Sequence, residues 1–128
     1  MAAPRIQRRV RADAEQIPRL RAAIASFAVE PCAYSDEARQ AIALAVTEAC
    51  TNVVRHAYPE TPGELLVEGW IDDDAQLTVV IIDNGIGLNG ASANAGLGLG
   101  LYLMRELADA QMSSDHHGTR VRLTFARR

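Results

Sequence analysis

The 128-residue chain has only two cysteines, no lysine and no long apolar run. The few cysteines, Cys32 and Cys50, together with the lack of a recognisable secretory segment, favour a reduced protein over a disulfide scaffold, although a bond between the two stays open. No stretch approaches the roughly 18 apolar residues of a membrane span. The net charge of -3 lacks the cationic excess typical of nucleic-acid binding. We therefore expect a cytoplasmic protein that contacts neither membrane nor nucleic acid directly.

The composition is typical of an ordinary globular protein. Hydrophobic residues make up 48% of the chain and charged residues 23%. A chain of this length can bury enough apolar surface to fold without metal ions or disulfides. All 13 basic residues are arginine, which we interpret as nucleotide-composition bias in the genome. We expect one domain spanning residues 1–128.

Apolar periodicity predicts four strands and three helices. Asp13 and Ser35 are the expected N-caps of the first two helices. The expected order is a strand around Ile6 and Val10, helices at about 14–28 and 35–56, a turn at 60–63, strands at 65–71 and 77–82, a helix at about 97–110, and a strand after Gly118. The polar stretch Ser113–His117 is placed between the last two elements. Short hairpin connections imply antiparallel pairing, so the predicted fold class is α+β, a two-layer sandwich with the helices on one face.

A glycine-rich stretch follows the strand that ends at Asp83. Five glycines lie at positions 85, 87, 96, 98 and 100, with a small-residue loop between them and a helical pattern after them. Glycine is favoured where a ligand approaches the backbone closely, so this density suggests a backbone shaped around a nucleotide. The alternative is a flexible turn between a strand and a helix.

The helix at residues 41–57 separates an apolar stripe from a polar one that holds Glu48, Asn52, Arg55 and Thr51. Glu48 and Asn52 are one turn apart and point the same way. An asparagine amide oxygen suits Mg²⁺, and a carboxylate one turn away could act as general base in phosphoryl transfer. The alternative is a polar face that simply meets water. Against it, Ala41, Leu44 and Ala45 surround the polar groups with small and apolar neighbours, as in a site.

Four ordered motifs resemble those of a known superfamily. They are Glu48-Ala-Cys-Thr-Asn52-Val-Val-Arg-His-Ala-Tyr58, Asp83-Asn-Gly85-Ile-Gly87, Gly96-Leu-Gly98-Leu-Gly100-Leu and Gly118-Thr119. In this order they resemble the N box, the two glycine boxes and the closing Gly-Thr of the GHKL ATPases. The chain looks most similar to the bacterial anti-sigma-factor serine/threonine kinases. The resemblance covers nearly the whole chain and implies a Bergerat-type ATP-binding fold.

The resemblance also implies roles for individual residues. Asn52 would hold Mg²⁺, Glu48 would be the catalytic base, and Asp83 would accept the adenine amino group. The other expected nucleotide contacts are Gly85 and Gly87 beside the base, Gly96, Gly98, Leu99 and Gly100 at the phosphates, and Thr119 at the adenine end. Arg55 or Arg105 could substitute for a cation in the lid. Family members phosphorylate a STAS-type anti-anti-sigma protein and bind a sigma factor, usually as dimers.

The lid departs from the family pattern. No basic residue lies between Asp83 and Arg105, and the segment 88–95 is short and built of small residues. Positive charge on the transferring phosphoryl group is a large catalytic term. ATP binding is therefore better supported than kinase activity, and the second hypothesis is a nucleotide-responsive binding module that transfers phosphate slowly or not at all.

Three other sequence patterns resemble binding sites but have simpler interpretations. Residues 85–90 spell the dinucleotide pattern GxGxxG, but no helix follows directly and no second parallel strand ends in an acid. The triplet Asp72–Asp74 is interpreted as a hairpin turn in preference to a metal cluster. His116 and His117 are interpreted as exposed turn residues in preference to metal ligands.

Overall fold

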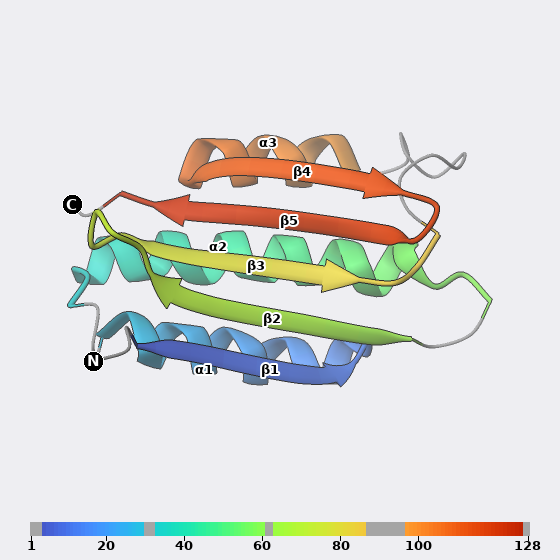
Figure 1. Ribbon diagram of the computed structural model, residues 1–128, viewed down its shortest axis with the longest axis horizontal. Helices are drawn as coiled ribbons and strands as arrows, with labels where there is room; N and C mark the ends of the chain where they lie inside the picture. Colours follow the sequence, from blue (N-terminus) through green and yellow to red (C-terminus); the bar gives the residue numbers. More distant parts are fainter. Residues whose placement is uncertain (1–3, 30–32, 61–62, 87–96, 127–128) are drawn as a thin grey trace.

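A computed structural model describes residues 4–29, 33–60, 63–86 and 97–126, with only the backbone described for 97–101. Its five-stranded sheet has the order β1-β2-β3-β5-β4, and every neighbouring pair is antiparallel. The strands are β1 (Arg5–Arg11), β2 (Glu64–Ile71), β3 (Leu77–Asp83), β4 (Asp109–Asp115) and β5 (Gly118–Phe125). The helices are α1 (Ile17–Val29), α2 (Asp36–Asn52) and α3 (Leu97–Leu107). All three lie on the same face of the sheet, which confirms the predicted two-layer α+β fold (Figure 1).

The core lies between the sheet and the helices. The predicted apolar stripe of α2 faces it, and each member is at most 5% exposed: Ile42, Val46, Ala49, Cys50 and Val53. The inward positions of β5 are also buried, at Val121, Leu123 and Phe125, as predicted. Central strand β3 is buried at every position except Ile82. The site described below therefore lies on a rigid central strand.

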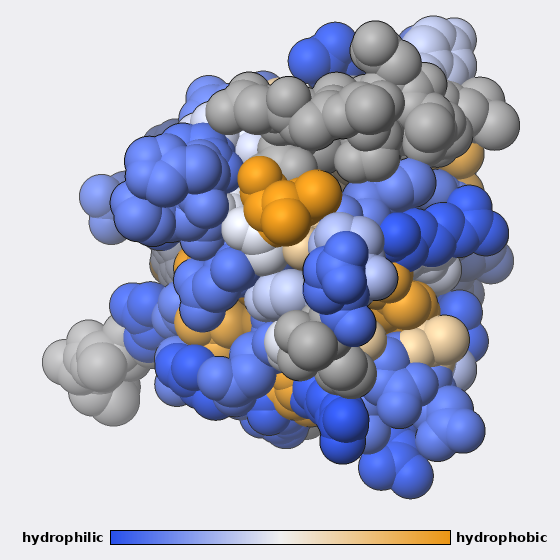
Figure 2. All heavy atoms as spheres, turned by 90° about the vertical axis from the view of Figure 1, so that its right-hand side faces the viewer, coloured by the Kyte–Doolittle hydropathy of each residue, from blue (hydrophilic) through white to orange (hydrophobic). Residues whose placement is uncertain are grey.

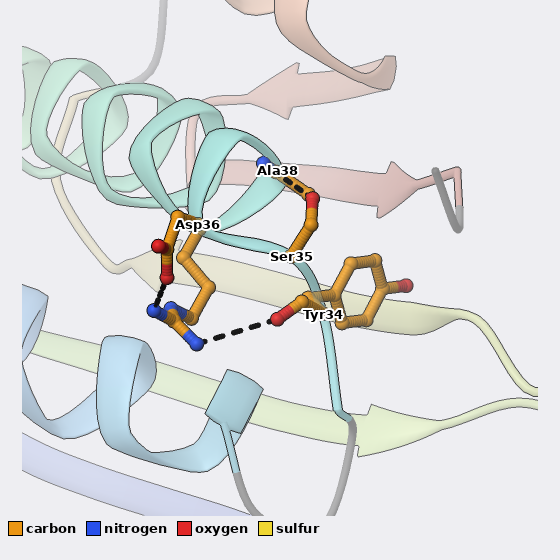
Figure 3. A network of polar contacts seen from close by, with 5 residues as sticks. Tyr34, Ser35, Asp36 and Ala38 are labelled. Carbon is orange, nitrogen blue, oxygen red and sulfur yellow. Dashed lines mark hydrogen bonds and ion pairs between the residues drawn. The ribbon is translucent and has the colours of Figure 1, made fainter.

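The start of α2 is held by three interactions of its own chain (Figure 3). The Ser35 hydroxyl accepts a hydrogen bond from the Ala38 N–H at 3.2 Å, as the predicted N-cap requires. The Arg39 guanidinium donates to the Tyr34 carbonyl and pairs with Asp36. The loop before the helix is thereby fixed to its first turn.

The predicted helix at 97–110 is too long, because α3 ends at Leu107 and a fifth strand, β4, begins at Asp109. The strand was missed because it is polar. Its residues alternate between exposed and half-buried, and Ala110 and Met112 are its only large or apolar inward residues. An edge strand has one neighbour and a solvent-facing margin, so a weak apolar signal suffices. The expected polar connection at 113–117 is in fact the end of β4 and its turn into β5.

The other predicted boundaries agree with the structure. Asp13 caps a 3₁₀ turn (Ala14–Gln16) that leads into α1. The second predicted helix does extend past Asn52, but its last turn (Val53–Ala57) is a π-helix. The turn expected at 60–63 lies partly outside the described residues.

Candidate functional site

Asp83 ends β3 as a buried carboxylate. Its side chain belongs to a residue only 5% exposed, and its Oδ1 accepts hydrogen bonds from the N–H groups of Gly85 (2.9 Å) and Thr119 (3.3 Å). Among the described residues, none donates to the second oxygen, Oδ2. Burial raises the pKa of Asp83, and the two backbone hydrogen bonds partly offset the rise. One carboxylate oxygen is thus held in place while the other is available to a ligand.

Two glycines allow the backbone to close tightly around Asp83. A Cβ on Gly85 would lie 2.1 Å from the Ala57 carbonyl oxygen, and one on Gly118 would lie 2.0 Å from the Asp83 carbonyl oxygen. Gly118 also has a φ of +136°, a backbone conformation that residues with a side chain rarely adopt. The glycines at 85 and 118 therefore have a structural reason of their own, namely close backbone contact between segments.

The end of α2 brings an asparagine amide to the same place. Asn52 is the last α-helical residue before the π-helical turn, and such turns are frequent at functional sites. Its Nδ2 is buried and has no hydrogen-bond partner in the described part of the chain. An unsatisfied buried amide is costly, so it indicates a position kept for another partner.

A small cavity joins these groups. Its volume is about 30 Å³, and it is lined by Ala49, Asn52, Val53, His56, Ala57, Ile81, Asp83, Met112, Thr119 and Val121. The walls are mostly apolar, with polar groups at a few points. Figure 2 looks onto this end of the molecule and shows apolar surface among the polar side chains. The cavity holds roughly one or two waters, so a purine would require it to open.

The structure brings three predicted site residues together, namely Asn52, Asp83 and Thr119. Glu48 lies one turn before Asn52 and is half-buried, but it does not line the cavity. Arg55 and Arg105 are exposed and do not line it either.

The remaining predicted contacts belong to the glycine-rich stretch. Gly98, Leu99 and Gly100 lie in the first turn of α3, at a helix N-terminus as expected. Gly87 and Gly96 lie outside the described residues.

Seven of the residues that line the cavity were not predicted as site residues, among them His56 and Met112. His56 follows Asn52 by one turn, so the spacing that paired Glu48 with Asn52 could have found it. Met112 could not be found, because it belongs to the missed strand β4.

The rejected metal sites have structural explanations. Asp72 Oδ1 accepts hydrogen bonds from the N–H groups of Asp74 and Gln76, as an ordinary turn residue does. His116 and His117 form the exposed two-residue turn between β4 and β5. Within the described ranges, no group of three or more metal-binding side chains of the His, Cys, Asp or Glu type occurs.

Cys50 is free and buried, and burial raises the pKa of its thiol to about 12. The disulfide left open by the sequence is therefore absent at Cys50.

None of the helices in the described part combines the length and apolarity that a bilayer crossing requires.

The comparisons with known proteins identify the family of the chain. A family model described as a histidine kinase-like ATPase domain matches residues 10–125. The chain belongs to this family. The resemblance to the anti-sigma-factor kinase branch is also confirmed at the family level, because curated relatives of this histidine kinase-like ATPase are serine-protein kinases named RsbW.

Two of these relatives come from Bacillus. The RsbW of Bacillus mycoides (strain KBAB4) is 29% identical over 94% of this chain and 83% of its own length. The RsbW of Bacillus cereus (strain AH187) is 30% identical over the same shares. Similarity across nearly the full ATPase domain supports kinase activity as a property of the family.

Solved structures share the fold. The crystal structure of the RsbU and RsbW domains of Rv1364c from Mycobacterium tuberculosis matches with a TM-score of 0.77 at 21% identity, over 95% of this chain and 32% of that one. The histidine kinase domain of a blue-light activated kinase from Erythrobacter litoralis matches with a TM-score of 0.63 at 21% identity, over 89% and 60%. This chain thus spans about a third of the mycobacterial chain, and these likenesses establish its fold alone.

Proposed function

We propose that the protein is an ATP-dependent serine/threonine kinase of the anti-sigma-factor type. It would phosphorylate a STAS-type anti-anti-sigma protein and regulate a sigma factor by partner switching. The observation that carries the proposal is the free oxygen of buried Asp83 in an apolar-walled cavity shared with Asn52. A carboxylate acceptor between apolar walls matches a flat heteroaromatic ring with an amino group, as in adenine.

The residues present also fit Mg²⁺. Mg²⁺ usually keeps several waters and takes few protein ligands, so a single amide can suffice. No described hydrogen bond holds the Asn52 amide nitrogen, so the amide is free to turn its oxygen toward a cation. When bound, the ion would neutralise phosphate charge, and Asn52 would be its protein ligand.

Glu48 is the proposed general base. In the transfer, the serine hydroxyl oxygen of the partner would attack the γ-phosphorus while its proton moves to the Glu48 carboxylate, and the bond to the bridging oxygen of ADP would break. Glu48 lies on the same helical face as Asn52, one turn away. Gly98 and Gly100 in the first turn of α3 would offer backbone N–H groups to the phosphates.

The second candidate is a binding module that responds to nucleotide with little or no transfer. The observation in its favour is that the described lining of the cavity includes no arginine, while Arg55 and Arg105 are exposed elsewhere. A transferring phosphoryl group without a nearby cation loses a large part of its electrostatic stabilisation.

Transfer of labelled phosphate separates the two candidates. The protein is incubated with γ-labelled ATP and Mg²⁺ in the presence of a cognate STAS protein, and ATP binding is measured separately by calorimetry. A kinase labels the STAS protein, whereas a binding module leaves it unlabelled.

The Glu48→Gln variant tests the proposed base. It should lower labelling by about 100-fold or more while ATP affinity changes less than about threefold, since the base acts only in the transfer step. Glu15→Gln, which changes an exposed glutamate that does not line the cavity, is the matched control and should retain labelling. Unchanged labelling by Glu48→Gln would remove Glu48 from its role.

We also propose that the chain is a single cytoplasmic domain that acts as a homodimer. Sedimentation of the protein with and without ATP tests the dimer, because a monomer at all concentrations would contradict it.

A further inference from the structure

A second concave surface lies at the opposite end of the molecule from Asp83. The first turn of α2, the last turn of α3 and the end of β5 meet there (Figure 1). They border a groove of about 770 Å³, far larger than the cavity at Asp83. This volume falls within the usual range of ligand sites. We name it the α2–α3 groove.

The groove has an acidic rim and an apolar floor. Glu37, Glu106 and Asp109 are exposed at its rim, and neither arginine nor histidine is among its described lining residues. Half-buried Leu107 and buried Phe125 lie in its floor. None of the three carboxylates forms an ion pair in the described part of the chain.

Two of the carboxylates are not explained by helix stability. Glu37 suits its place in the first turn of α2, but Glu106 lies in the last turn of α3, where the helix dipole favours a cation. Its described partner is the hydroxyl of Tyr102, one turn earlier, which does not compensate its charge. Asp109 adds a second carboxylate just beyond the helix end. Arg105 is also in the last turn of α3 but does not line the groove, so the charged side chains in the described lining are all carboxylates. Together with the carbonyl end of α3 they favour a negative potential in the groove.

We propose that the α2–α3 groove docks a segment of a partner protein that carries at least two arginine or lysine side chains beside an apolar one. The cationic groups would meet the rim carboxylates, and the apolar side chain would cover the floor near Leu107 and Phe125. Charge complementarity of this kind sets orientation and association rate. The site is separate from the proposed ATP site and does not depend on it.

The test uses a fluorescein-labelled peptide with three arginines separated by leucines, and a matched peptide with glutamate in place of arginine. Anisotropy measures binding to the full chain at low ionic strength. The arginine peptide should bind at least about tenfold more tightly, and the chemical shifts it causes in amide NMR spectra should cluster at Ala38, Ala108 and Asp109. Shifts spread over the whole surface, or equal binding of both peptides, would overturn the proposal.

Charge-matched variants locate the interaction. The triple change Glu37→Gln, Glu106→Gln and Asp109→Asn should weaken binding of the arginine peptide about tenfold or more. The control changes the same number of exposed carboxylates outside the groove, with Glu15→Gln, Glu60→Gln and Asp73→Asn, and should alter affinity less than about threefold. Equal loss in both variants would mean non-specific attraction and would overturn the proposal.

Other occupants give different results. Arg127 and Arg128 follow Ala126, a groove residue, in the sequence. If Arg127→Ala with Arg128→Ala raises peptide affinity about tenfold, the groove belongs to the chain's own terminus and the proposal falls. The proposal also falls if sedimentation shows a dimer for the wild-type chain and a monomer for the groove triple variant. The occupant of the groove would then be a second copy of this chain.

Discussion

A tyrosine hydroxyl ties each end of β3 to the elements around it, and the two ends differ in what else they hold. At the start, the Tyr34 hydroxyl accepts from the Leu77 N–H and donates to the Phe125 carbonyl, both at 2.7 Å. At the other end, the Tyr58 hydroxyl accepts from the Asn84 N–H at 2.9 Å and donates to the Glu64 carbonyl at 2.6 Å. The chemistry is the same, but Tyr34 is buried and Tyr58 is half-buried.

The polar groups near the two ends are satisfied to different degrees. Thr78, fully buried near the start of β3, lies within hydrogen-bond distance of Asp72 and Thr124. At the other end, Asp83 keeps an oxygen without a described donor, and no described residue is a partner of the Asn52 amide nitrogen. Buried polar groups that serve only the fold are normally paired. The comparison therefore indicates that the start of β3 serves the fold, and it supports the proposal that the end of β3 binds a ligand.

The strongest test contrasts the positive-φ residues that lie near the two ends. Gly118→Ala should destabilise the fold by about 3 kcal/mol, because its φ of +136° and its contact with the Asp83 carbonyl exclude a side chain. Ala75 has a φ of +61° in the turn before β3, so Ala75→Gly should stabilise by up to about 1 kcal/mol. Urea denaturation measures both. A Gly118→Ala variant as stable as the wild type, or an Ala75→Gly variant that is less stable, would contradict the backbone conformations described for these two residues.

The next test contrasts the two aspartates. Asp83→Asn keeps an oxygen for Gly85 and Thr119 but offers an NH₂ group where the adenine amino group needs an acceptor. It should weaken ATP binding about 100-fold, or about 2.7 kcal/mol, without loss of folding stability. Asp72→Asn, at the other end, should leave ATP affinity unchanged. Calorimetry measures both, and equal losses would remove Asp83 from adenine recognition.

Replacing either tyrosine should have a smaller effect. Tyr34→Phe should mainly lower folding stability, whereas Tyr58→Phe should also lower ATP affinity. Tyr34→Phe leaves buried backbone groups of Leu77 and Phe125 unpaired and should cost about 2 kcal/mol of folding free energy. Tyr58→Phe should cost only about 1 kcal/mol because water can reach its exposed partners, Glu64 and Asn84. Burial raises the pKa of Tyr58, so its hydroxyl stays protonated and able to donate.

Nucleotide binding should reverse the order of the two tyrosine variants. Tyr58→Phe loosens Asn84, next to Asp83, and should weaken ATP binding about threefold. Tyr34→Phe should leave ATP affinity unchanged. Urea denaturation and calorimetry on the two proteins measure the pair of properties, and a larger loss of ATP affinity in Tyr34→Phe would contradict the division between the ends.

The sequence allowed most of the fold to be predicted because strong patterns carried it. The apolar stripe of α2, the alternation in β5 and the caps at Asp13 and Ser35 each follow from local periodicity or local hydrogen bonding. Strand β4 failed because an edge strand needs little apolar surface, and its polar residues suit a loop as well. The missed strand also hid Met112 from the predicted site.

The site could be predicted as a set of residues but not as a shape. The family resemblance predicted that Asn52, Asp83 and Thr119 belong to one site, and all three line the same cavity. It did not predict that Gly85 would face the Ala57 carbonyl, because that contact depends on where the π-helical turn ends. Nor could periodicity show that Glu48 stays outside the cavity lining, since residues one turn apart share a face without sharing a pocket.

The smallest effect comes from the protonation of Asp83. Its pKa is raised by burial, so the folded state binds this proton more strongly than the unfolded chain does. The associated stability is fully present below the ordinary carboxyl pKa and is lost as pH rises through the raised value. Adenosine affinity should change in the opposite direction, because a protonated carboxyl loses an acceptor oxygen. Binding should therefore weaken as pH falls from neutral toward the raised pKa of Asp83.

Adenosine is the right ligand for this measurement because it has no phosphate to titrate. Asp83→Asn should bind weakly at every pH in this range, and Asp72→Asn should follow the wild-type curve. A wild-type affinity that does not change with pH, alongside a weak Asp83→Asn, would mean that Asp83 stays ionised and that burial alone does not govern its pKa. A pH dependence retained in Asp83→Asn would place the titrating group elsewhere and would remove Asp83 from this role.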